Sequence, residues 1–107
     1  MYTRMLELTV KGDKKTELFN RIKVDILPIL NKQKGFVEIL ALESHVELNK
    51  VMFLSFWHTT LDAERYQDET FPKVKKVFEP FLTAAPIVKV FTVEETLSEK
   101  FTHLMAA

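Results

Sequence analysis

The sequence predicts an α+β domain in which two helices cover one face of an antiparallel β-sheet. Assigned by hydrophobic periodicity, its segments follow the order strand, helix, strand, strand, helix, strand. The chain has 107 residues, the length of one domain, and 47% of them are hydrophobic. We therefore expect one domain at residues 1–95, with more apolar side chains than two helices can cover. Residues 96–107 are expected to form a C-terminal tail that could pack on a partner subunit.

The first half of the chain predicts a strand, a helix and a second strand. Residues 2–10 alternate between two faces, one of them apolar, as strands with one buried face do. Apolar residues then recur at helical spacing over residues 14–31, after Asp13, a residue type that caps helix N-termini. Pro28 lies near the end of this stretch, so its last turn is expected to be kinked or irregular. A second strand is expected at residues 36–43, which are rich in Phe, Val, Ile and Leu.

The second half predicts a strand, a helix in two pieces and a last strand. Residues 44–49 read as a hairpin connection to residues 50–58, the most apolar strand of the chain. Residues 59–62, Thr-Thr-Leu-Asp, match a capping box that starts the next helix. The residue before a proline avoids helical angles, so Pro72 is expected to divide this helix into two pieces. The last strand is expected at residues 87–93.

The order of these elements is that of the ferredoxin-like βαββαβ arrangement. Residues 37–42 and 51–57 are apolar at both odd and even positions, which is typical of strands covered on both faces. The helices cover only one face of the sheet. We therefore predict a homodimer packed sheet to sheet, a dimeric α/β barrel, because a second copy is the simplest cover for the other face.

Composition excludes several classes of function. Fifteen basic residues balance fifteen acidic ones, so we expect neither nucleic acid nor a membrane surface as a partner. The only two glycines, Gly12 and Gly35, cannot form a nucleotide-binding loop, and no cysteine is present for a thiolate metal site. Three scattered histidines predict no metal site, and we expect no cofactor. A carboxylate close to the N-terminus argues against a signal peptide, so we expect a cytoplasmic protein.

Three short stretches and one further aromatic residue carry a resemblance to a known family. Residues 33–38 read Gln-Lys-Gly-Phe-Val-Glu, a polar loop and a glycine before an aromatic residue that opens a strand. Residues 53–59 read Phe-Leu-Ser-Phe-Trp-His-Thr, and residues 63–66 read Ala-Glu-Arg-Tyr on a helix that continues to Phe71. Over residues 2–93 the chain resembles the antibiotic biosynthesis monooxygenase family of dimeric α/β-barrel proteins. The resemblance implies a barrel-like dimer with a small pocket between the helices and the sheet of each subunit.

The same resemblance implies an activity. The family includes cofactor-free oxygenases that act on polyphenolic or quinol substrates, and haem-degrading enzymes. The haem degraders use an asparagine on the first strand, a tryptophan on the second helix and a histidine further along that helix. This chain instead has Leu6 and Glu7, then Tyr66, and no histidine at residues 72–76, so we expect no haem degradation. The resemblance therefore implies a cofactor-independent monooxygenase that acts on an aromatic, polyphenolic or quinol-like substrate.

Five residues are the candidates for this site. His58 is the candidate general base, because histidine titrates near neutral pH, and Tyr66 could present a hydroxyl to the substrate; these two are the candidate catalytic residues. Trp57, Phe71 and Phe78 are the candidate substrate-binding wall. An apolar cavity with one base and one or two donors is enough, because an electron-rich substrate anion can reduce oxygen itself.

Plainer explanations stay open for all of these residues. His58 can be a solvated strand end, and the aromatic residues can be core. Arg4, Glu7 and Glu38 could line the pocket, but we expect them to form salt bridges at a subunit interface, and the lysines of residues 73–76 to be solvated. The alternative function is a non-catalytic, dimeric ligand-binding or stress-responsive module of the same fold. A cavity above about 300 Å³ that both His58 and Tyr66 reach would favour the enzyme.

Overall fold

The computed structural model describes residues 1–94, which form four strands and six helical segments. The strands are β1 (Tyr2–Thr9), β2 (Phe36–Glu43), β3 (Lys50–Trp57) and β4 (Ile87–Thr92). The helical segments are α1 (Lys15–Arg21), the π-helical turn η1 (Ile22–Ile26), α2 (Leu27–Asn31), α3 (Thr60–Glu69), α4 (Phe71–Phe78) and the 3-10 turn η2 (Glu79–Phe81). The predicted strands are confirmed to within one residue at each end. The predicted tail lies outside the described residues, so its separation from the domain stays a prediction.

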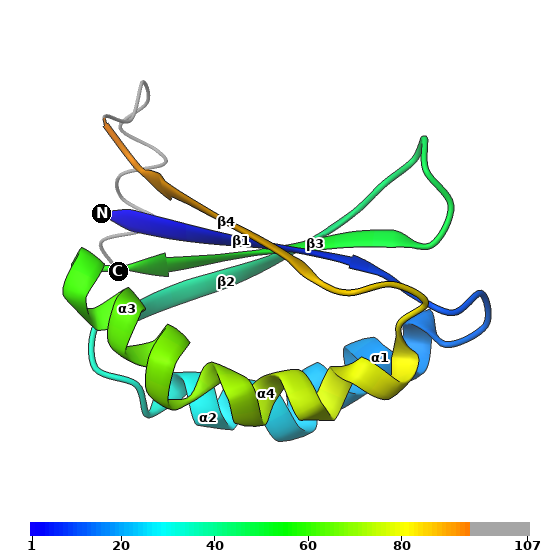
Figure 1. Ribbon diagram of the computed structural model, residues 1–107, viewed down its shortest axis with the longest axis horizontal. Helices are drawn as coiled ribbons and strands as arrows, with labels where there is room; N and C mark the ends of the chain where they lie inside the picture. The colour runs from blue at the N-terminus through cyan, green and yellow to red at the C-terminus, as the bar shows by residue number, and fades with distance from the viewer. Residues whose placement is uncertain (95–107) are drawn as a thin grey trace.

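The four strands form one antiparallel sheet in the order β2-β3-β1-β4. Figure 1 shows the helices together on one side of this sheet, with no helix of residues 1–94 on the other side. The predicted ferredoxin-like α+β fold with helices on one face is confirmed. The central position of β1 and β3 places their inward side chains beneath the helices.

The strand register brings two polar residues into this interior. Leu8 of β1 pairs with Val51 of β3, and both side chains are fully buried in the core. Four residues earlier on β1, Arg4 pairs with Ser55 of β3 on one side and with Val90 of β4 on the other. Side chains two or four residues apart share a face of a strand, so Arg4 and Ser55 also face the helices.

The first helical stretch contains a π-helical turn. Pro28 has no N–H and cannot donate to the carbonyl of Val24 four residues earlier, and η1 lies directly over this gap in the helical ladder. The predicted irregular end of the helix is therefore confirmed, with the irregularity before the proline. The predicted cap is wrong: Asp13 is exposed and Lys14 holds the N-cap position with no side-chain hydrogen bond. A backbone turn replaces the cap, because the Lys14 N–H donates to the Lys11 carbonyl at 2.9 Å.

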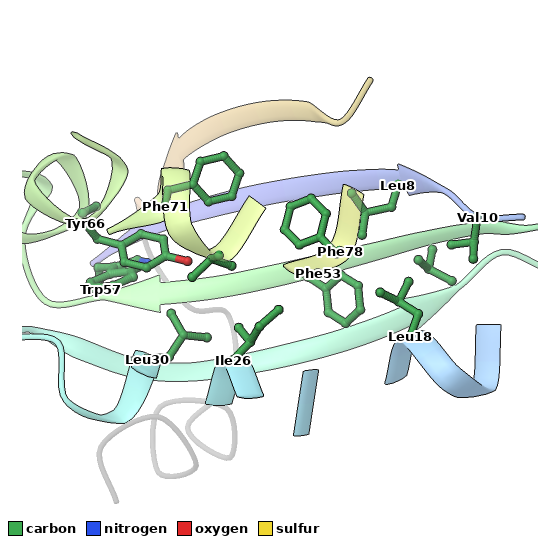
Figure 2. Packing of buried hydrophobic residues seen from close by; sticks show 13 residues of the cluster. Leu8, Val10, Leu18, Ile26, Leu30, Phe53, Trp57, Tyr66, Phe71 and Phe78 are labelled. Carbon is green, nitrogen blue, oxygen red and sulfur yellow. The ribbon is translucent and has the colours of Figure 1, made fainter. Parts of the chain in front are cut away.

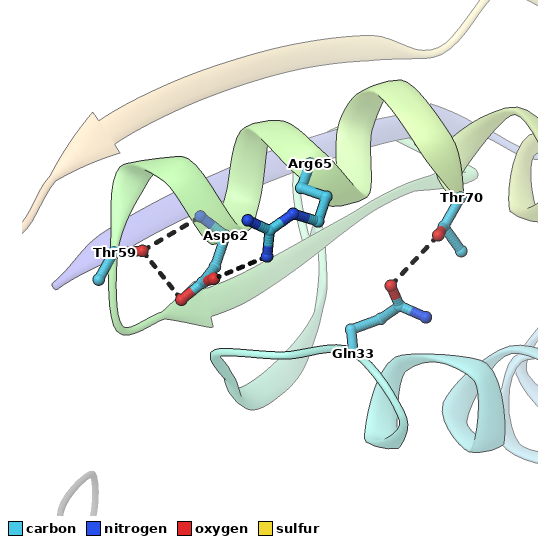
Figure 3. A network of polar contacts seen from close by, with 5 residues as sticks. All are labelled: Gln33, Thr59, Asp62, Arg65 and Thr70. Atoms are coloured by element: carbon cyan, nitrogen blue, oxygen red, sulfur yellow. Dashed lines mark hydrogen bonds and ion pairs between the residues drawn. The ribbon is translucent and has the colours of Figure 1, made fainter.

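The capping residue predicted for the second helix is confirmed. Thr59 is the N-cap of α3, and its Oγ1 accepts a hydrogen bond from the Asp62 N–H at 3.1 Å. The Thr59 hydroxyl also donates to the Asp62 carboxylate at 2.9 Å, and Arg65 pairs with the other carboxylate oxygen at 3.3 Å (Figure 3). Asp62 therefore anchors the start of α3 through side chains rather than through the backbone N–H that a full capping box would use.

The predicted division of the second helix is also confirmed. Thr70 separates α3 from α4, and Pro72 lies in the first turn of α4, where its missing N–H costs nothing. The Thr70 hydroxyl donates to the Gln33 side chain at 3.2 Å, which ties this break to the loop before β2 (Figure 3). In the same loop Gly35 adopts φ +80°, and its carbonyl accepts a hydrogen bond from the His58 N–H at 2.8 Å. The loop before β2 and the end of β3 are thereby held together.

The core fills the space between the sheet and the helices (Figure 2). Its aromatic rings form a continuous series in which each ring contacts the next. Ring centroids are 5.5 Å apart for Phe36 and Trp57, 5.0 Å for Trp57 and Tyr66, 6.1 Å for Tyr66 and Phe71, and 6.0 Å for Phe71 and Phe78. This series joins β2, β3, α3 and α4, so the aromatic residues proposed for the site are also the main packing elements of the domain.

The opposite face of the sheet carries exposed apolar side chains on both edge strands. We call Leu40, Leu42, Ile87 and Phe91 the outer apolar face; their exposed fractions lie between 40% and 49%. On β2 and β4 these four residues alternate with residues that face the helices, so their side chains point to the opposite face of the sheet. No helix of residues 1–94 covers them. Within residues 1–94 the structure thus shows exposed apolar side chains on the face that the sequence predicts to need cover, although it holds no partner chain.

Candidate functional site

A small cavity of about 30 Å³ lies between the sheet and the helices. At this size it holds roughly one or two water molecules and is far below the roughly 300 Å³ at which ligand pockets begin. Its lining is mostly apolar and comes from three strands, β1, β2 and β3, and from the helices. The lining residues are Arg4, Leu6, Leu8, Ile22, Ile26, Leu30, Ile39, Phe53, Ser55, Tyr66, Val74 and Phe78. Polar groups gather at one end only, around Arg4.

Arg4 is the unusual residue of this site, because its guanidinium is almost completely buried. The residue is 4% exposed, and its guanidinium carbon lies 5.0 Å from the ring centroid of Tyr66 and 4.7 Å from that of Phe71. One terminal nitrogen donates to the side-chain oxygen of Gln67 on α3. The Nε–H is buried and has no partner. Two aromatic faces and one amide oxygen are thus the surroundings of a full positive charge.

No carboxylate of residues 1–94 lies within 4 Å of Arg4. The ion pairs of the described residues all join other groups, and burial lowers the pKa of Arg4 because it disfavours the charged form. An arginine stays protonated even so, and a buried cation without a counterion is costly. Such a group is typical of sites that receive an anion.

The hydroxyl of Tyr66 is a hydrogen-bond donor at this site rather than a base. Tyr66 is 3% exposed, and burial raises the pKa of its hydroxyl to about 12, with the nearby Arg4 charge acting weakly in the opposite direction. Figure 2 shows its oxygen directed away from α3, into the interior between sheet and helices. Near neutral pH the group therefore keeps its proton and can donate it in a hydrogen bond to a bound oxygen atom.

Ser55 completes the polar end of the cavity. It faces Arg4 across the β1–β3 ladder, and its Oγ accepts a hydrogen bond from the indole N–H of Trp57 at 3.0 Å. This bond satisfies the single donor of a tryptophan that is fully buried. Trp57 is thereby fixed against the ring of Tyr66, which in turn lines the cavity.

The structure brings together some of the predicted site residues and not others. Tyr66 and Phe78 line the cavity, while Trp57 and Phe71 pack against the ring of Tyr66 one layer further out. His58 follows the last residue of β3, is exposed, and lines neither this cavity nor the groove described below. His58 and Tyr66 therefore do not open into one cavity, and the cavity contains no group that titrates near neutral pH.

A groove of about 190 Å³ lies beside the cavity, between α3 and the inner side of β4. Its walls are Tyr2, Arg4, Ala63, Glu64, Gln67, Val88 and Val90. Val88 and Val90 face the helix side of the sheet but are 37% and 52% exposed, because α3 and α4 do not extend over β4. Arg4 lines both the cavity and this groove, so its side chain is the point where the two meet.

The expectation of a salt bridge at a subunit interface is corrected for Arg4, which lies in the interior between sheet and helices. Glu7 pairs with Lys50 of its own chain at 3.2 Å, and the Glu38 carboxylate accepts a hydrogen bond from the Ile39 N–H at 2.9 Å; an interface contact of these two residues stays a prediction. The sequence carried a usable signal for Arg4. It lies on the apolar face of its strand, in step with the buried side chains, where a charged residue requires a special explanation.

The part of the chain that the structure describes shows no cluster of three or more His, Cys, Asp or Glu residues that could hold a metal ion. Within residues 1–94, no helix has the length and apolar character needed to cross a membrane.

Comparison with known proteins places this architecture among solved structures. The sequence matches no family model and no curated protein. SnoaB from Streptomyces nogalater, a cofactor-independent oxygenase, is 18% identical with a TM-score of 0.72, over 90% of this chain and 95% of SnoaB. A Caulobacter crescentus protein with the provisional name antibiotic biosynthesis monooxygenase is 14% identical with a TM-score of 0.74, over 88% and 90% of the two chains. NE2512 from Nitrosomonas europaea, of unknown function, is 12% identical with a TM-score of 0.71, over 91% and 93%.

At these identities the likeness is one of fold. The chain has the fold of the antibiotic biosynthesis monooxygenase proteins, and the fold implied by the resemblance is confirmed. The named activities belong to the neighbours, and some neighbours with the same fold have no known function. Function therefore has to be argued from the site.

Proposed function

We propose that the chain is a small cofactor-independent monooxygenase that acts on an aromatic, quinol-like substrate. One observation carries the proposal: the buried guanidinium of Arg4 has no counterion among residues 1–94 and lies over the ring of Tyr66, 5.0 Å from its centroid, at the polar end of an apolar cavity. The fold shared with SnoaB, a cofactor-independent oxygenase, supports it. A positive charge and a donor in an apolar site are what a substrate oxyanion needs.

The reaction balances without a bound cofactor. A ring carbon with two hydrogens, next to an aromatic carbonyl system as in an anthrone, loses one proton and becomes an anion whose charge rests largely on oxygen. The anion passes one electron to O₂, and the two radicals join to form a peroxide anion at that carbon, which takes up a proton and becomes a hydroperoxide. Loss of water then leaves a new carbonyl, so one oxygen atom ends in the product and the other in water.

The residues of the site have distinct roles in this scheme. Arg4 stabilises the oxyanion by charge and so makes the substrate more acidic, and Tyr66 donates a hydrogen bond to the same oxygen. Because His58 lies outside the cavity and the groove, we assign it no contact with the substrate. The cavity alone is too small for such a substrate, so we place most of the substrate in the α3–β4 groove, with its oxygen at Arg4.

A second candidate is a non-catalytic ligand-binding module of the same fold. The specific observation in its favour is that His58 and Tyr66 do not share a cavity, and that neither the cavity nor the groove reaches about 300 Å³. No side chain lining the cavity titrates near neutral pH, so a substrate proton has no receiver in the cavity. Binding would then need Arg4 and Tyr66, while turnover would be absent.

We also propose that the chain forms a homodimer through the outer apolar face. Leu40, Leu42, Ile87 and Phe91 are all about half exposed and lie on the two edge strands of one sheet face. A second copy of this sheet would cover them and produce the barrel-like dimer implied by the resemblance. The cytoplasmic location expected from the sequence stays a prediction.

Oxygen consumption with anthrone and with dihydroxynaphthalenes tests the activity. We expect uptake by the wild-type protein, loss of at least tenfold in Arg4→Met and a smaller loss in Tyr66→Phe. His58→Ala and Arg21→Met, an exposed arginine on α1, serve as controls that should keep the wild-type rate. Saturable binding of these compounds without oxygen uptake would favour the ligand-binding module instead.

A further inference from the structure

We infer that the α3–β4 groove is a binding site for a small aromatic carboxylate with a single negative charge. The inference rests on the proposed function, since it names the chemical class that the same arginine would receive. It starts from Arg4, which is only 4% exposed. The Nε–H of this buried side chain has no hydrogen-bond partner. None of the described residues accepts a hydrogen bond from this Nε–H, so the arginine has a free donor that a ligand can satisfy.

The groove borders the same arginine. Arg4 is the shared wall of the inner cavity, at about 30 Å³, and of the groove, at about 190 Å³, which is the larger of the two spaces. The groove has room for part of an aromatic ring system, whereas the cavity holds only water. A ligand that enters along β4 therefore meets Arg4 from the groove side.

The chemistry of the arginine selects the anion. Guanidinium presents its N–H groups in one plane, which matches the two oxygens of a carboxylate better than a single alkoxide or halide. The rings of Tyr66 and Phe71, at 5.0 and 4.7 Å, hold this plane, and Gln67 fixes one terminal nitrogen. The receptor group is thus oriented before any ligand arrives, which reduces the entropy lost on binding.

The walls of the groove select the rest of the ligand. Tyr2, Ala63, Val88 and Val90 give an apolar lining with one aromatic ring, which fits a flat hydrophobic body. Glu64 stands on the α3 side as an exposed carboxylate. Its negative charge disfavours a second anionic group on the ligand, so a monoanion is selected over a dicarboxylate.

Benzoate and its uncharged isostere benzamide are the test probes, titrated into protein labelled at the valine methyl groups and followed by NMR. We expect saturable benzoate shifts at Val88 and Val90, with benzamide and phthalate at least tenfold weaker. Arg4→Met should reduce benzoate binding to the level of benzamide. Val90→Glu should weaken benzoate at least tenfold, while Val24→Glu, an exposed valine on η1, should leave it unchanged.

Equal affinity for benzoate and benzamide in the wild-type protein would overturn the inference, as would benzoate shifts confined to other valines or no saturable binding. The wild-type comparison needs no variant, so it stays decisive if Arg4→Met fails to fold. Oxygen uptake with uncharged anthrone is measured on the same samples. Uptake without a preference for benzoate removes the carboxylate site alone, and a preference for benzoate without uptake removes the monooxygenase alone.

Discussion

Replacing Arg4 by methionine should make the protein more stable while it removes the anion site. Methionine keeps the unbranched stem that crosses the interior below Tyr66 and Phe71, and it deletes only the charged group. In most proteins the loss of a buried arginine is destabilising because it leaves a carboxylate unpaired. Here no carboxylate of the described residues depends on it, and Gln67 is only partly buried, so its amide can turn to water.

The magnitude follows from the surroundings of the guanidinium. Keeping one ion at 4% exposure costs several kcal/mol, here taken as about 5. Two ring contacts return about 1 kcal/mol each, and the charge-assisted hydrogen bond to Gln67 returns about 2 kcal/mol. The free energy of unfolding should therefore rise by about 1 kcal/mol in Arg4→Met.

Urea unfolding monitored by the fluorescence of Trp57, the single tryptophan, measures this change. The measurement is made at several protein concentrations, because dimerisation would add its own contribution. Arg21→Met, which removes an exposed arginine that pairs with Asp25, is the matched control and should change stability by less than about 0.5 kcal/mol. A loss of more than about 1 kcal/mol in Arg4→Met would refute the view that this charge is uncompensated.

Three further predictions concern other parts of the molecule. Burial raises the pKa of Tyr66 from 10 to about 12, so between pH 10 and 12 only the folded state keeps this proton. The free energy of unfolding should therefore fall by up to about 1.4 kcal/mol per pH unit between pH 10 and 12. Urea titrations of Tyr66→Phe should lack this decrease. Gly35→Ala should cost more than about 2 kcal/mol in thermal or urea unfolding, because its φ is +80° and a Cβ would overlap the Asp62 carboxylate. Gly12→Ala should change stability little, because a Cβ there would make only an ordinary contact with Asn49 at 3.9 Å. Leu42→Arg on the outer apolar face should shift sedimentation from dimer to monomer; Leu48→Arg, 90% exposed in the hairpin, should not, and a monomeric wild-type protein at micromolar concentration would contradict the dimer.

The elements of the fold could be predicted because their signals are local. The alternation of residues 2–10 and the apolar run of residues 50–58 define strands whose ends differ from the structure by one residue. Pro28 and Pro72 mark breaks because a missing N–H acts at a fixed distance along the chain. The cap predicted at Asp13 is wrong because a backbone turn precedes the helix, in which the Lys14 N–H donates to the Lys11 carbonyl, and the N-cap position falls on Lys14.

The site could be predicted only in part because it depends on contacts between distant segments. Tyr66 was identified from its inward position on a helix, and the structure places it at the cavity. His58 is next to Trp57 in sequence, but successive residues of a strand point to opposite sides, so the neighbour of a core residue turns outward. Arg4 could not be recognised as a site residue from the sequence, because the pairing of β1 with β3 and β4 is needed to show that Ser55 and Val90, and no acidic residue, lie opposite it.

The π-helical turn at Ile22–Ile26 also sets the alignment of one cavity wall. Leu18, Ile22, Ile26 and Leu30 recur every four residues, and all four are buried or partly buried on one side. In a regular α-helix each step of four residues rotates by about 40°, so Leu30 would be turned about 120° away from Leu18. The wider π turn absorbs part of this rotation. Removing one residue together with the wide turn would leave eleven steps between Leu18 and Leu30, a net rotation of about 20° in a regular helix, so both side chains would still face the sheet. The π turn is therefore the device by which this helix holds one additional residue without turning its buried face away from the core.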